Sequence, residues 1–173
     1  MLVKILIINL LIITNASIVS AKISVDEENF LKKIFNEDIP KKSRVIVKGD
    51  AKEKIKKIMG SKYKKRLFSY WKNDENTIWI LNSIGKYKPI TAGFIIGECK
   101  IQNASVLTYR EQHGYEIKYQ SFLSRFDDIQ SSKNKLSKKI DNISGATLSV
   151  NSMKRMAKLA LLLDKLSNEN TCT

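Results

Sequence analysis

The sequence predicts an α+β fold: a mostly antiparallel sheet flanked by helices, with a C-terminal helix as the last element. Two observations predict it. Apolar residues recur at helical spacing within residues 24–60 and 149–167, whereas the stretch 66–110 consists of aromatic and β-branched runs separated by turn residues. The chain has 173 residues, 43% of them hydrophobic, which is enough for one domain with a sizeable core.

The first 21 residues differ in character from the rest. Lys4 is followed by an apolar run that ends in Val19-Ser20-Ala21. This pattern predicts a signal peptide, residues 1–21, cleaved after Ala21. An uncleaved N-terminal anchor is the alternative, although the run is short for a membrane span of about 20 residues. We therefore expect a single exported domain over residues 22–173, in the periplasm or otherwise outside the cytoplasm.

Residues 22–64 form the N-terminal, helical part of this domain. A first helix starts at Ser24 or Asp26, and its acidic first turn and basic end suit the helix dipole. Residues 50–60 predict a second short helix that stops at a glycine. Between the two helices, residues 45–47 predict a short strand.

Residues 65–167 contain the predicted sheet and the C-terminal helix. Four runs predict antiparallel neighbouring strands: "RLFSYW", "TIWILNSIG", "ITAGFIIG" and "IQNASVLTYR". After them we expect a short helix over 115–126, a polar loop over 130–139 and a brief last strand over 139–144. The last helix, over 149–167, contains no Gly or Pro, and its methionine-containing apolar stripe predicts core packing.

The charge balance is strongly basic, with 31 basic and 17 acidic residues and a formal net charge of +14. A basic protein can favour nucleic acid, anionic lipid or acidic partners. Here the basic residues are mostly lysines spread along the chain, and arginine, the better reader of bases and phosphates, is scarce. The composition therefore favours a solvated basic surface, and no nucleic-acid partner is expected.

The two cysteines, Cys99 and Cys172, allow one disulfide, which export permits. Cys172 is the next-to-last residue, where chains fray. A buried or edge thiol at Cys99 is therefore the favoured interpretation, and a disulfide is the alternative. Neither cysteine has the spacing of a metal site, so no metal is expected.

The segment "DNISGATLS", residues 141–149, combines features that suit a phosphate. Its Ser-Gly pair predicts a sharp turn, and the first turn of the next helix has unpaired N–H groups and a positive dipole end. Lys138, Lys139 and Lys154 are near in sequence and add positive charge. The alternative is a plain helix start, with Ser or Thr as the N-cap.

"DNISGAT" resembles the attachment motif of the FMN-binding domain family, found in the flavin-bearing subunits of sodium-pumping NADH:quinone reductases and related ion-translocating complexes. The resemblance implies that Thr147 carries FMN through a phosphoester, made by an exported flavin transferase that uses FAD and magnesium. It also implies that Asp141, Ser144, Gly145 and Ala146 are the motif that the transferase reads. The last three would lie beside the flavin.

Residues 92–126 also resemble the central region of this family. Its Glu and Gly correspond to Glu111 and Gly114, and its aromatic residue corresponds to Phe122 or Phe126. The Tyr-Arg-Glu form before them is similar to stand-alone exported members. The pump subunits usually have Thr and Pro where this chain has Gln and His.

Several side chains in this region allow two interpretations. The Glu111 carboxylate can tune the flavin or accept its hydrogen bonds, or it can form a surface ion pair with Arg110 or a lysine. Tyr109 and Tyr115 can stack on an isoalloxazine ring, or they can be core aromatics. His113, the single histidine, is best explained as a polar loop residue.

Together these features predict an exported flavoprotein, with covalent FMN at Thr147, that transfers electrons outside the cytoplasm. Its partners would be the flavin transferase and a membrane or extracytoplasmic electron donor and acceptor. We expect an electron carrier with no catalytic residues of its own; if it is an enzyme, it is an FMN-dependent oxidoreductase. The alternative is an exported, basic, non-redox binding module for an anionic ligand or polymer.

Overall fold

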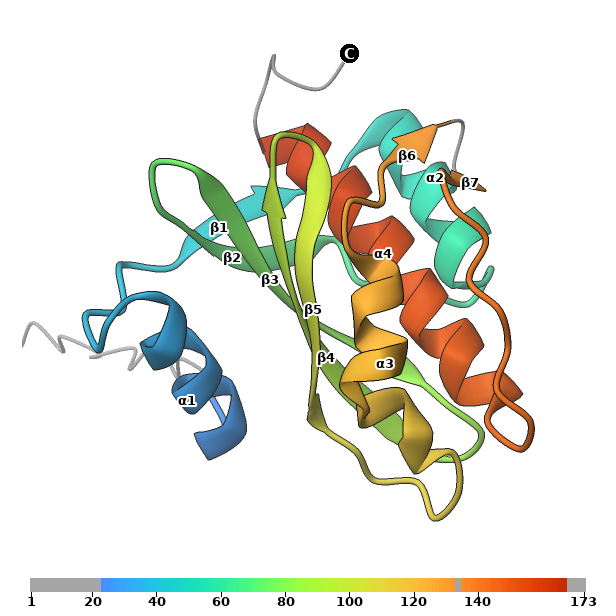
Figure 1. Cartoon of the computed structure of the whole chain (residues 1–173). Coiled ribbons are helices and arrows are strands. Elements are labelled where there is room, and N and C mark those ends of the chain that lie inside the picture. The colour runs from blue at the N-terminus through green and yellow to red at the C-terminus, as the bar shows by residue number, and fades with distance from the viewer. Residues whose placement is uncertain (1–22, 133–134, 168–173) are drawn as a thin grey trace, which may run out of the picture.

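A five-stranded sheet forms the middle of the computed structural model, which describes residues 23–132 and 135–167 (Figure 1). In space, as along the chain, its strands follow the order β1 (Ser43–Ile46), β2 (Leu67–Lys72), β3 (Asn76–Ile84), β4 (Pro89–Gly97) and β5 (Lys100–Thr108). Each neighbouring pair is antiparallel. The predicted α+β fold with its antiparallel sheet is therefore confirmed.

Helices cover both faces of the sheet (Figure 1). One face carries α1 (Val25–Ile34), and the other carries α2 (Gly49–Met59) and α4 (Thr147–Ser167). The division follows from strand alternation, because successive side chains point to opposite faces. Trp71 packs in the cluster under α1, whereas its neighbour Tyr70 packs in the main core.

The first helix begins as its sequence predicts. Ser24 is the N-cap of α1, and it forms a capping box in which Glu27 bonds back to the Ser24 backbone. Three acidic residues occupy the first turn, and two lysines occupy the last turn. These charges complement the helix dipole. The capping hydrogen bonds show that the helix starts at Ser24 rather than at Asp26.

Short elements connect β5 to α4. The stretch expected to be a short helix contains three consecutive helical segments, η1 (Tyr115–Lys118), α3 (Gln120–Leu123) and η2 (Ser124–Phe126). Two-residue strands, β6 (Ser131–Ser132) and β7 (Lys135–Leu136), pair within the segment expected to be a polar loop.

The brief strand expected over 139–144 is wrong, because that segment is irregular. Among the described residues, the one β-bridge outside the named strands joins Ile101 of β5 to Ile129. It does not involve the segment 139–144. The segment 139–144 instead inserts Ile140, which is buried, into the main core. The buried side chain of Ile140, rather than strand pairing, therefore anchors this segment.

The main core lies between the sheet and the layer of α2, α3 and α4. Its largest fully buried side chains include Trp79, Phe94, Phe122 and Phe126. The methionines of the last helix, Met153 among them, are fully buried in the same core, as the apolar stripe predicts.

Polar contacts hold α4 along β3. Near the end of β3, the Arg155 guanidinium donates to Ser83 Oγ from Nη2 at 3.1 Å and to the Ile84 carbonyl at 2.8 Å. Near its start, Thr77 Oγ1 donates to the buried Asp164 carboxylate at 2.6 Å. The helix therefore runs antiparallel to β3, and its N-terminus lies near the turn from β3 to β4.

Cys99 is disulfide-bonded, so the interpretation as a free thiol is wrong. It lies at the tip of the hairpin between β4 and β5, where both Glu98 and Cys99 have positive φ. The chain's other cysteine, Cys172, lies outside the described residues, as does the predicted signal peptide over residues 1–21.

Within residues 23–132 and 135–167, no helix combines the length and apolar character that crossing a membrane requires.

Replacement of Phe94 by Ala should lower the free energy of unfolding by about 3–5 kcal/mol. Phe94 is fully buried and packs edge-on against Phe126, with ring centroids 6.4 Å apart, so the change leaves a cavity between the sheet and its helical layer. Urea unfolding measures the effect. The control is Ile46→Ala, at a side chain that is 61% exposed and whose loss should cost less than about 1 kcal/mol. Equal losses in the two variants would contradict the described core.

Candidate functional site

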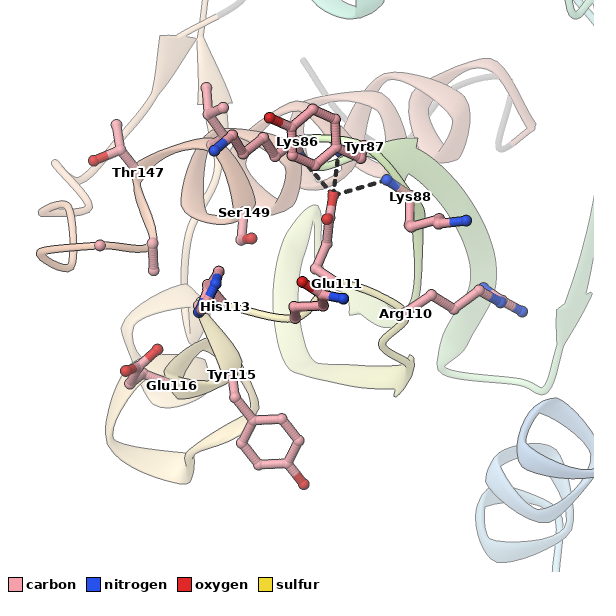
Figure 2. A pocket seen from close by; sticks show the side chains of 15 residues that line it. Lys86, Tyr87, Lys88, Arg110, Glu111, His113, Tyr115, Glu116, Thr147 and Ser149 are labelled. Carbon is pink, nitrogen blue, oxygen red and sulfur yellow. Dashed lines mark hydrogen bonds between the residues drawn. The ribbon is translucent and has the colours of Figure 1, made fainter.

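A pocket of about 910 Å³ opens at one end of the sheet (Figure 2). Three segments line it: residues 86–88 in the turn from β3 to β4, residues 110–116 after β5, and residues 145–149 at the start of α4. These segments meet because the end of β3, the start of β4 and the end of β5 all lie at the same end of the sheet. The N-terminus of α4 points toward that end. The volume lies within the roughly 300–1,000 Å³ of small-molecule sites.

Most of the predicted site residues come together in this pocket. The five that line it are Glu111, Gly114, Gly145, Ala146 and Thr147. The other two are Asp141 and Ser144. Ser144 lies in the turn that precedes the helix, and Asp141 lines a second hollow of about 400 Å³. There the Asp141 carboxylate forms an exposed ion pair with Lys139 at 3.1 Å.

Thr147 is the first residue of α4, two residues earlier than the sequence predicts. Its side chain is exposed at the edge of the pocket (Figure 2), and within the described part of the chain its hydroxyl makes no hydrogen bond. The helical ladder begins with the Val150 N–H, which donates to the Ala146 carbonyl at 2.9 Å. The N–H groups of the first three helical residues lie outside that ladder, so this end is suited to an anion.

Thr147 and Ser149 both lie inside α4, so neither is its N-cap, and Ser144 lies three residues before the helix begins. Ala146 precedes the helix and is buried. Gly145, in the turn before it, has a φ of 78°, in the left-handed region that favours glycine. The interpretation of the segment as an ordinary Ser or Thr cap therefore does not hold.

The loop after β5 packs closely against the start of α4 at Gly114. A Cβ atom at this position would lie 2.9 Å from Tyr109 Oη and 3.1 Å from both Ala146 Cβ and Ser149 Oγ. The backbone there has a φ of 87°. Glycine is therefore required at position 114 both by space and by backbone conformation.

Tyr109 links the same loop to the helix. Its hydroxyl donates to the His113 carbonyl and lies 3.0 Å from Ser149 Oγ. Burial raises the pKa of Tyr109, although the Ser149 hydrogen bond acts to lower it. Tyr109 therefore holds the pocket wall in place, whereas Tyr115 lines the pocket with half of its side chain exposed.

Glu111 binds the neighbouring turn through a single oxygen. Its Oε1 accepts the backbone N–H groups of Lys86 at 2.5 Å, Tyr87 at 2.6 Å and Lys88 at 2.9 Å, as the dashed lines in Figure 2 show. The pKa of Glu111 is lowered, first by the Lys88 N–H. Arg110, the ion-pair partner considered for Glu111, instead donates to the Pro89 carbonyl at 3.2 Å.

The positive charge of the pocket comes from residues that the sequence interpretation missed. Lys86, Lys88 and Arg110 line it. The three lysines expected to supply this charge line the second hollow instead; they are Lys138, Lys139 and Lys154. The turn from β3 to β4 reads "GKYKP" in the sequence, where two lysines flank a tyrosine. Nothing in these letters ties the turn to Glu111 or to the helix start.

Two further residues stand apart from the pocket. Phe122 and Phe126, the candidates for the family's aromatic residue, are fully buried in the main core.

Groups of His, Cys, Asp and Glu that could hold a metal ion do not occur within residues 23–132 and 135–167.

A comparison with curated proteins finds no match to the chain. A comparison with protein families matches residues 85–162 to the model described as the FMN-binding domain. The match includes all three segments that line the pocket and the motif that begins at Asp141. Residues 85–162 therefore match the FMN-binding domain family, as the motif predicts, and this match indicates a flavin-binding protein.

Proposed function

We propose that this protein is an exported flavoprotein that carries FMN covalently on Thr147 and transfers electrons outside the cytoplasm. One observation carries the proposal. Thr147 is the final residue of the Asp-x-x-Ser-Gly-Ala-Thr motif, and within the described part of the chain its hydroxyl is exposed and makes no hydrogen bond at the edge of the pocket.

The residues of the pocket fit FMN. The first turn of α4 and the nearby cations Lys86, Lys88 and Arg110 suit a phosphate. Tyr87 and Tyr115 lie on opposite sides of the pocket (Figure 2) and expose aromatic surface that suits a flat ring. When bound, FMN supplies one- and two-electron redox chemistry, and the protein supplies attachment, orientation and electrostatics.

Attachment is a phosphoryl transfer to the Thr147 hydroxyl. Thr147 Oγ1 forms a bond to the flavin-side phosphorus of FAD, the pyrophosphate bond breaks, and AMP leaves with the electron pair of that bond. The hydroxyl proton passes to a base of the transferase or to solvent. Asp141 is well exposed and lies outside the pocket, which suits a residue that a separate transferase reads before attachment.

Export completes the proposal. The pattern of residues 1–21 directs the chain to the compartment of an exported transferase. A covalent bond keeps the flavin on the protein there, where a dissociated flavin would be lost. A membrane donor and an extracytoplasmic acceptor would then exchange electrons with the flavin at the open pocket.

Co-expression with a flavin transferase tests the proposed bond. After denaturation, the wild-type polypeptide should carry flavin fluorescence and a mass increase of one FMN less water, because the phosphoester survives unfolding. Thr147→Ser should keep part of the adduct, and Thr147→Ala should lose it. The matched control is Thr108→Ala, at a strand hydroxyl that bonds Asp26 at 3.1 Å. An undiminished adduct in Thr147→Ala, or none on the wild type, would contradict the proposal.

The second hollow favours the alternative function, a non-redox module for an anionic ligand. Its lining includes five lysines and one carboxylate; the lysines are Lys135, Lys138, Lys139, Lys154 and Lys158. This alternative predicts a colourless protein after co-expression, with binding to an anionic polymer that falls steeply as salt screens the charges. A yellow protein with a covalent adduct decides for the flavoprotein.

Gly114→Ala should disturb the pocket. The added methyl group meets Tyr109, Ala146 and Ser149 at a backbone φ of 87°, so we expect the free energy of unfolding to fall by about 1–3 kcal/mol and the bound flavin's fluorescence to change. The control is Gly49→Ala, at a φ of 53° with no atom within 4 Å, which separates backbone strain from crowding. If both variants change the flavin signal equally, the contact of the loop with α4 does not shape the site.

A further inference from the structure

The turn between β3 and β4 directs three consecutive backbone N–H groups at one point. The donors are Lys86, Tyr87 and Lys88, at 2.5, 2.6 and 2.9 Å from Glu111 Oε1. Successive N–H groups that converge in this way form a concave anion site, called a nest. In this protein the anion is supplied by the chain itself, from 23 to 25 residues further along.

Gly85 makes this close approach possible. A Cβ atom on Gly85 would lie 2.7 Å from Glu111 Oε1 and 3.1 Å from Ile90 Cδ1. Any larger residue would therefore push the carboxylate out of the nest or displace the buried side chain of Ile90. Gly85 also closes the hairpin, because its N–H donates to the Lys88 carbonyl at 3.0 Å.

The nest, rather than a ligand, holds Oε1 of the Glu111 carboxylate. One carboxylate oxygen already accepts three hydrogen bonds, and these amide dipoles offset its negative charge. An uncompensated carboxylate here would repel a phosphate in the same pocket. The N–H groups left for a ligand's phosphate are those at the start of α4.

The turn that Glu111 holds carries one wall of the pocket. Lys86, Tyr87 and Lys88 all line it. Tyr87 is 73% exposed, and the contact described for its ring is the Lys86 ammonium, 4.9 Å from the ring centroid. With so few side-chain contacts, the position of this wall depends on the backbone of the turn, and the backbone depends on Glu111.

We propose that Glu111 is a positioning residue: by filling the nest, it fixes the β3–β4 turn and thereby sets where Lys86 and Tyr87 meet the flavin. This inference rests on the proposed function, since it assigns a role toward the bound FMN. It replaces the hypothesis that Glu111 itself contacts the ring. It also explains how the Glu111 carboxylate can lie in a pocket whose cations and helix N-terminus suit an anion.

Backbone amide exchange in the flavin-free protein tests the first step. Glu111→Ala should speed exchange of the Lys86, Tyr87 and Lys88 amides by about tenfold or more, since each loses a hydrogen bond to a charged acceptor. Glu111→Gln keeps an oxygen acceptor without the charge, so its exchange should be intermediate. The matched control is Glu116→Gln, at another glutamate that lines the pocket and should leave these three amides unchanged. Unchanged exchange in Glu111→Ala would overturn the proposal.

The flavin itself tests the second step. In protein loaded by the transferase, Glu111→Ala should shift the flavin's absorption spectrum and reduction potential, and Glu111→Gln should recover part of the wild-type values. If amide exchange is faster but the absorption spectrum and reduction potential of the flavin are unchanged, the position of the turn does not affect the flavin, and the proposal is overturned. A shifted flavin with wild-type exchange would instead support direct contact. If the wild type never acquires flavin but Glu111→Ala still speeds amide exchange, the proposed function is contradicted. The conclusion that Glu111 fixes the turn is then still supported.

The same amides should respond to pH. The pKa of Glu111 is lowered in the folded protein, chiefly by the Lys88 N–H and in smaller part by the Lys86 ammonium. Its contribution to turn stability is therefore present above the ordinary glutamate pKa and is lost as pH falls through the lowered value. Tyr109, whose pKa is raised, stays uncharged in this range, and Arg110 bonds the Pro89 carbonyl. The ratio of wild-type to Glu111→Gln exchange rates should rise toward one in acid; a ratio that does not vary with pH would contradict this assignment.

Discussion

The packing of α4 along β3 is the constraint on which the site depends. Arg155 holds one end of this contact and Asp164 the other, and a row of buried apolar side chains lies between them. Because both ends of the contact are fixed, the helix runs antiparallel to β3. Its N-terminus therefore lies at the end of the sheet where β3 turns into β4. The unpaired N–H groups of the helix, the cations of the turn and the Thr147 hydroxyl therefore share one pocket.

Around that helix end, contacts within the chain hold the walls of the pocket in place. Gly114 lets the loop after β5 approach α4, Tyr109 links that loop to Ser149, and Glu111 fixes the opposite turn. These contacts leave exposed the groups that suit a flavin phosphate and ring.

Much of the fold follows from the sequence, because strand and helix periodicities are strong over residues 66–110 and along the last helix. The failures have physical causes. The segment 139–144 has too few apolar residues to define a strand, and it contributes Ile140 to the core instead. The partner of Glu111 could not be predicted, since backbone N–H groups have no sequence signature. Nearness in sequence also misplaced Lys138, Lys139 and Lys154, because it does not tell on which side of a helix the preceding loop runs.

The proposed attachment is one phosphoester bond on the Thr147 hydroxyl. The most direct measurement is fragmentation mass spectrometry of the tryptic peptide 140–154, from protein exposed to the transferase and FAD. This peptide contains Thr147 and three serines, Ser144, Ser149 and Ser152, so its fragment ions distinguish the candidate hydroxyls. Attachment at Thr147 predicts a mass increase of FMN less water in every fragment that contains Thr147 and in none that lacks it. The same mass on a serine-containing fragment without Thr147, or on no fragment, would contradict it.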